Sequence, residues 1–229
     1  MIMRSLAGFF CALRGNYHFM IGSPKMRYLL EKAIMADTKS PMAHINYAFV
    51  LLDEGADEGL VAEHIEKTEG LVVKEWQKSD IAIAKTYMLA VNEKFAEAID
   101  FLQNYEPKNA KIYSLIAKLH VQSGDFGYAL TNALYALELE RGAETLNYLG
   151  VAQYFLEDYA SAKSSFLQAL AISDNLIEAN FYLGLINGQE GDEAAARKYF
   201  LAAKICDIKY FSIVGIEDIE KRARAYEFR

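Results

Sequence analysis

Apolar residues in this 229-residue chain recur at helical spacing along most of its length. The chain has only three prolines, Pro24, Pro41 and Pro107, and each falls between two apolar-periodic segments, where proline marks the end of a helix. Such scarcity of breakers favours long helices over a turn-rich β fold. The pattern therefore predicts an all-α protein.

Two neighbouring stretches, Ala143 to Leu176 and Ile177 to Tyr210, match one another at one constant shift. The matched positions carry the same residue in both stretches: Tyr148 and Tyr182, Leu149 and Leu183, Gly150 and Gly184, Asp158 and Asp192, Ala162 and Ala196, Phe166 and Phe200, and Ala169 and Ala203. The shift equals the period of about 34 residues that is typical of helical-hairpin repeats. The sequence therefore predicts a repeated pair of helices.

This repeat resembles the tetratricopeptide family. The resemblance implies a right-handed superhelical solenoid of antiparallel helix pairs, here about five to six hairpins. Gly150 and Gly184 would lie in first helices where a side chain blocks the second helix, and Ala162 and Ala196 would allow the same close approach from the second helix. A glycine inside a helix costs about 1 kcal/mol relative to alanine, so its placement suggests a packing reason. We accordingly expect leucine at Gly184 to damage folding far more than leucine at Glu178.

The repeat extends towards the amino terminus with decreasing regularity. We expect one solenoid over residues 1–229, with hairpins at 7–40, 41–74, 79–109, 110–142, 143–176 and 177–210, of which the first two are degraded. Irregular terminal repeats are common in solenoids, because an end must not present the same apolar face.

Both ends of the chain leave alternatives open. Residues 212–228 form a last amphipathic helix, with Ile216, Ile219 and Ala223 at helical spacing, and we expect it to cap the open end of the last hairpin. The alternative is a helix that docks a partner. At the amino terminus, the apolar stretch from Ser5 to Leu13 predicts the first helix of the solenoid, and the alternatives are a removed leader or a truncated membrane anchor.

Net charge and cysteine usage narrow the class of partner and the cellular compartment. The formal net charge is −7 and the pI is near 5.2, which argues against nucleic acid as the partner. Cys11 and Cys206 fall in different repeats among apolar residues, so they predict small buried hydrophobes rather than a disulfide framework. This usage fits a reducing compartment and a cytoplasmic location. A leader or an anchor would instead indicate an exported or membrane-attached protein.

No motif in the sequence predicts catalysis, a metal or a cofactor. It contains no phosphate-binding loop and no glycine-rich dinucleotide turn after a strand. The four histidines, His18, His44, His64 and His120, lack a second His or Cys at metal-ligand spacing, and Glu63-His64 is interpreted as an ordinary surface pair. We therefore expect a non-enzyme.

The resemblance implies that first helices line a concave groove in which a partner lies. The groove residues carried over from the family register are mostly apolar or aromatic: Ile45, Phe49, Tyr87, Lys118, Asn147, Val151, Tyr154 and Phe181. The Lys, Arg and Asn clamp of the chaperone-tail-binding members is largely absent, with only Lys118 and Asn147 in place. An apolar groove suits a protein or peptide with an amphipathic helix or an apolar extended segment. The alternative for these residues is packing between hairpins. A second class of function is a self-assembling scaffold, a homo-oligomer in which the terminal repeats or the last helix pair between copies.

Overall fold

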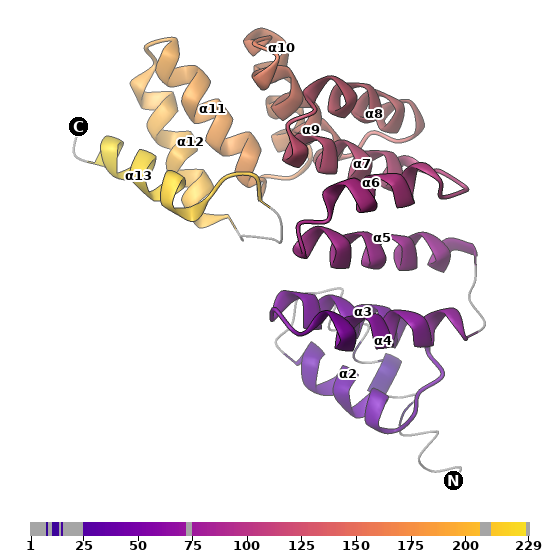
Figure 1. Ribbon diagram of the computed structural model, residues 1–229. Helices are drawn as coiled ribbons and strands as arrows, with labels where there is room; N and C mark the ends of the chain where they lie inside the picture. The colour runs from indigo at the N-terminus through magenta and orange to yellow at the C-terminus, as the bar shows by residue number, and fades with distance from the viewer. Residues whose placement is uncertain are drawn as a thin grey trace. The chain divides into compact units, whose positions relative to one another are not determined.

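The computed structural model describes residues 8, 11–13, 15, 25–71, 75–206 and 212–227. Over these residues its regular secondary structure is α-helical, without strands, so the predicted all-α fold is confirmed (Figure 1). Contacts divide the chain into two compact units, residues 1–102 (unit 1) and 103–229 (unit 2). None of the helices in the described ranges has the length and apolar character that crossing a bilayer requires.

Unit 1 is built around one central helix, α3. Its helices are α2 (Met26–Met35), α3 (Pro41–Asp53), α4 (Glu58–Glu69), α5 (Glu75–Val91) and α6 (Phe95–Gln103). Helices α2, α4 and α5 all contact α3, and α4 also contacts α5. Ser40 caps the start of α3, because its side-chain hydroxyl accepts a hydrogen bond from the Ala43 N–H. Pro41 follows at the first helical position, where the main-chain N–H that proline lacks would have no partner within the helix. Most of the predicted amino-terminal helix lies outside the described residues, although Ala12 packs with Leu30.

Unit 2 consists of three helix pairs and a last helix. The pairs are α7 (Ala110–Ser123) with α8 (Phe126–Leu139), α9 (Ala143–Phe155) with α10 (Tyr159–Ile172), and α11 (Ile177–Gln189) with α12 (Glu193–Ile205). The first helices of successive pairs also contact one another: α7 contacts α9, and α9 contacts α11. Equivalent aspartates begin two of the second helices: Asp158 accepts the Ser161 N–H, and Asp192 accepts the Ala195 N–H.

The repeat glycines lie where the two helices of a hairpin touch. A Cβ placed on Gly150 would lie 2.6 Å from Cε1 of Phe166, and one on Gly184 would lie 2.7 Å from Cε1 of Phe200. Both phenylalanines belong to the second helix of the same hairpin and are fully buried. The structure thus confirms the packing reason inferred from the sequence.

The last helix closes unit 2 as predicted. α13 (Ile216–Glu227) contacts α12 (Figure 1). It buries Ile219 and Ala223 in the apolar core that also contains Phe200. It begins four residues after the predicted start, because Ser212 accepts the Val214 N–H and holds a bend in the chain.

Candidate binding surface and a buried histidine pair

The predicted groove residues divide between the two units and differ in exposure. Unit 1 holds Ile45 and Phe49 on α3 and Tyr87 on α5, and unit 2 holds Lys118 on α7, Asn147, Val151 and Tyr154 on α9, and Phe181 on α11. Three side chains of the set, Phe49, Tyr87 and Tyr154, keep part of their surface exposed. Ile45, Val151 and Phe181 are buried in apolar cores, because neighbouring helices cover the sides on which they lie. The partner-binding role of the set stays a prediction.

In unit 2, three polar side chains are buried on successive first helices. Lys118 is 6% exposed, Asn147 is 1% exposed, and Glu178 on α11 is 7% exposed. The side-chain amide of Asn147 donates to Oε2 of Glu178 at 3.0 Å, and Oε1 of Glu178 accepts the Ile213 main-chain N–H at 3.3 Å. Nζ of Lys118 lies 5.7 Å from the ring centre of Tyr148 on α9. We call the side of α7, α9 and α11 that carries Lys118, Asn147 and Glu178 the first-helix face.

Glu178 is a functional candidate that the sequence did not indicate. The sequence marked it only as the position where leucine should damage folding less than leucine at Gly184, and that comparison stays a prediction. In the structure Glu178 is buried and accepts hydrogen bonds from two donors. An acidic residue in the first turn of a helix is usually interpreted as a response to the helix dipole, so nothing in the local pattern separates the two roles. Only a contact between distant segments, Glu178 and Ile213, identifies it.

The hydrogen bond to Glu178 fixes the orientation of the Asn147 side chain. A carboxylate can only accept, so Nδ2 of Asn147 must point to Glu178 and Oδ1 must point away. Among the described residues no donor reaches this Oδ1, which is buried. On the first-helix face, Glu178 therefore accepts two hydrogen bonds, whereas Oδ1 of the neighbouring Asn147 accepts none from the described residues.

Aromatic side chains border the polar group on the same face. The rings of Tyr154 and Tyr182 lie 4.6 Å apart, centre to centre. Burial raises the pKa of both hydroxyls; the charge of Asp218 on α13 raises that of Tyr182 further, and the charge of Arg222 lowers that of Tyr154.

Two solved structures are similar to this chain in backbone fold. A chain of the APC/C hetero-tetramer Cut9-Hcn1 aligns over 96% of this chain and 42% of its own length, with 15% sequence identity and a TM-score of 0.69. Yeast Tom70 aligns over 93% of this chain and 46% of its own length, with 15% identity and a TM-score of 0.68. The chain has the tetratricopeptide-repeat fold. It spans less than half the length of either similar chain. No protein-family model matches the sequence, and the comparison with curated proteins gives no match.

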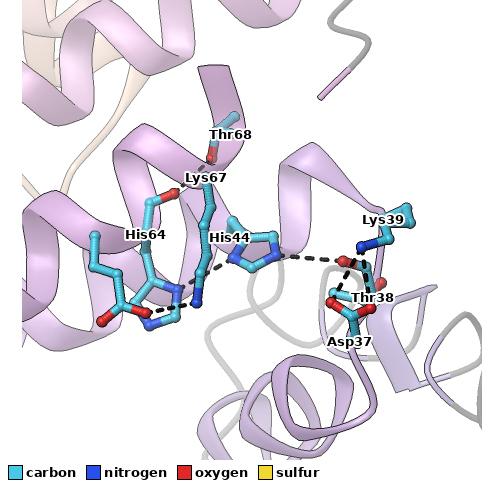
Figure 2. Close-up of polar contacts among 8 residues, drawn as sticks. Asp37, Thr38, Lys39, His44, His64, Lys67 and Thr68 are labelled. Atoms are coloured by element: carbon cyan, nitrogen blue, oxygen red, sulfur yellow. Dashed lines mark hydrogen bonds and ion pairs between the residues drawn. The ribbon is translucent and has the colours of Figure 1, made fainter. Parts of the chain in front are cut away.

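Unit 1 contains a pair of buried histidines that the sequence did not predict (Figure 2). Nδ1 of His44 on α3 lies 3.1 Å from Nδ1 of His64 on α4, and the two residues are 6% and 4% exposed. Nε2 of His44 faces the carbonyl oxygen of Thr38 at 3.4 Å. The interpretation of Glu63-His64 as a surface pair was wrong for the histidine: Glu63 is exposed, whereas His64 lies on the inner side of the helix.

The environment of the pair keeps both rings neutral. Burial lowers the pKa of His64 to about 4; a proton on His44 would lower it further, and the charge of Lys67 acts in the same direction. Burial also lowers the pKa of His44. In the neutral pair one Nδ1 donates to the other, so a single proton joins α3 to α4. Within the described ranges, no third His, Cys, Asp or Glu joins the pair in a possible metal-binding group.

Proposed function

We propose that the chain is a non-catalytic protein-interaction module, in which the first-helix face of unit 2 holds a segment of another protein. One observation carries the proposal: the Glu178 carboxylate on this face accepts a main-chain N–H, that of Ile213. A side chain that binds the main chain recognises a polypeptide without requiring a particular sequence. The tyrosines beside it supply the large aromatic area that anchors protein partners.

The fold supports the same proposal. One of the two similar structures is a hetero-tetramer of proteins, so there the fold takes part in a protein assembly. The net charge of −7 opposes binding to the phosphates of nucleic acid. A polypeptide is therefore the partner class that fits the charge, the fold and the buried acceptors together.

A photo-crosslinking experiment in the native cell tests the proposal. A photoreactive phenylalanine analogue replaces Tyr154, which is partly exposed on the first-helix face, and in a matched chain it replaces Ile205, which is 85% exposed on the second helix α12. We expect a crosslink to another protein from position 154 and none from position 205. Crosslinks from position 205 alone would contradict the proposal.

A second candidate, association between copies of the chain, is favoured by a separate observation. Helices α8 and α10 present large apolar side chains that are 44% to 66% exposed: Tyr128, Leu134, Tyr135, Leu139, Leu167 and Ile172. Light scattering at increasing concentration tests it. A mass that rises with concentration, and that Leu134→Glu returns to one chain, supports this candidate, whereas a constant monomer mass excludes it.

A further inference from the structure

We infer that residues 212–214 are a displaceable occupant of the first-helix face, and that the partner which displaces them is an extended segment with β-branched aliphatic side chains. The segment of the chain and the partner would compete for the same acceptors. This inference rests on the proposed function of that face.

The internal segment occupies the face through both its main chain and its side chains. The Ile213 N–H donates to Oε1 of Glu178 at 3.3 Å. The Ile213 side chain packs against the apolar cluster of α7, α8 and α9 that contains Ala117 and Tyr148. Val214 is 6% exposed and belongs to the larger core of unit 2. Residues 212–214 thus hold the place where a partner's main chain would bind.

The internal segment nevertheless satisfies only one of the two acceptors. Its next N–H, that of Val214, donates at 3.2 Å to the hydroxyl of its own Ser212, whose hydroxyl in turn donates to the Val214 carbonyl. The bend thus uses this second donor within the segment itself. Oδ1 of Asn147, a residue that is 1% exposed, has no donor among the described residues.

An extended segment would complete what the bent segment leaves open. In a strand, alternate N–H groups point to the same side and repeat every two residues. Asn147 and Glu178 are joined by one hydrogen bond of 3.0 Å, so a single segment can reach both acceptors. A buried acceptor without a donor costs free energy. A partner segment that supplies both donors therefore gains more binding free energy per residue on this face than residues 212–214 do.

The side-chain preference follows from what the internal segment places there. Ile213 lies half-buried against the cluster that contains Ala117 and Tyr148, and Val214 belongs to the larger core. Both are β-branched, and β-branched residues also favour the extended backbone that the two acceptors need. A segment with Ile or Val at neighbouring positions and no turn-forming Ser before them fits this chemistry.

The test is a binding titration of the full chain with a dye-labelled, end-blocked peptide, Lys-Ile-Val-Val-Lys. Ile213→Ser weakens the internal segment, so we expect this variant to bind the peptide about tenfold more tightly than the wild type. Ile216→Ser is the matched control, because Ile216 lies three residues after Ile213 and is 54% exposed. The Ile216→Ser variant should bind the peptide with the same affinity as the wild type. Adding Asn147→Leu to Ile213→Ser removes the vacant acceptor and should abolish the gain.

A measurement on the unchanged chain supplies an independent result. Saturating peptide should speed hydrogen exchange at the Ile213 amide, because that donor leaves Glu178. Equal affinity of the wild type and Ile213→Ser, or exchange at Ile213 that the peptide does not change, would overturn the inference. Crosslinking from position 154 tests the proposed function separately. If a partner crosslinks there but Ile213→Ser does not bind the peptide more tightly, the inference about residues 212–214 is wrong and the proposed function stands.

Discussion

At the scale of single residues, the absence of a side chain at Gly150 and Gly184 is what allows each hairpin to close. The rings of Phe166 and Phe200 fill the space that a Cβ would take. A helix-interior glycine costs conformational entropy, and here that cost is offset by burial of a whole aromatic ring.

Gly184→Ala should lower the free energy of unfolding by about 1–3 kcal/mol, because the new methyl group overlaps Phe200 in a packed core. Gly127 on α8 is the matched control, because a Cβ there meets nothing within 4 Å. Gly127→Ala should raise stability by about 0.4–1 kcal/mol. Denaturant unfolding of both variants measures the difference, and equal effects would show that the glycine contact is unimportant.

His44 and His64 form the other notable contact at this scale, and from it we expect unit 1 to lose stability in acid. The pKa of His64 is about 4 in the folded state against 6.5 for the free side chain, so between these values the unfolded state binds more protons. The stabilisation is complete above about pH 6.5 and is lost as the pH falls towards 4. Its size for His64 is about 3 kcal/mol.

The variant His64→Gln should flatten this dependence, because glutamine does not titrate. We expect the unfolding free energy of the wild type to fall steeply between pH 6.5 and 4, and that of the variant to fall less. Denaturant unfolding at several pH values measures both slopes. Parallel slopes would show that the histidine pair does not cause the acid sensitivity.

At the scale of elements, the two helices of each pair in unit 2 have different roles. The first helices, α7, α9 and α11, contact both a second helix and another first helix, so even their polar side chains become buried. The second helices α8 and α10 keep exposed apolar positions. The last helix, α13, adds apolar surface to the open end of the last pair, as solenoid ends require.

Ile219→Ala should remove most of this capping contact. Ile219 is 3% exposed, and truncating a buried isoleucine costs about 2–5 kcal/mol. Ile216→Ala on the same helix removes a side chain that is 54% exposed and should change stability by less than about 0.5 kcal/mol. Thermal unfolding of the two variants side by side measures this, and similar melting temperatures would argue against α13 as a cap.

At the scale of the whole molecule, the chain consists of two compact units with separate apolar cores. The histidine pair lies in unit 1, and the repeat glycines and the first-helix face lie in unit 2. Substitutions in separate cores with no shared partner add in their effects on stability.

The two units should therefore respond to different perturbations. At pH 4.5 we expect hydrogen exchange to accelerate in α3 and α4, with α9 and α11 unchanged relative to the intrinsic rate. Gly184→Ala should accelerate exchange in α11 and α12 and leave α3 and α4 unchanged. Mass-resolved exchange by peptide segment measures both effects. Acceleration throughout the chain in either experiment would indicate one cooperative unit instead of two.

The sequence by itself determined the helical fold, the repeat and the close contacts within a hairpin. These features follow from local periodicity and from residue size: a glycine that recurs at the same repeat position predicts the same close approach of two helices twice. That the rings of Phe166 and Phe200 are what lies against these glycines was seen only in the structure. The sequence also separated the apolar side of the last helix from its polar side, because a period of 3.6 residues fixes which side chains share a face.

The tertiary structure alone decided which polar residues are buried and what they bind. His44 and His64 are 20 residues apart and Glu178 and Ile213 are 35 apart, and neither pair has a spacing that local periodicity can relate. It also decided that Val151 and Phe181 are core residues while Tyr154 keeps some surface. Which side of a first helix is covered depends on where neighbouring helices and the carboxy-terminal segment pack, and that packing is a property of the folded chain.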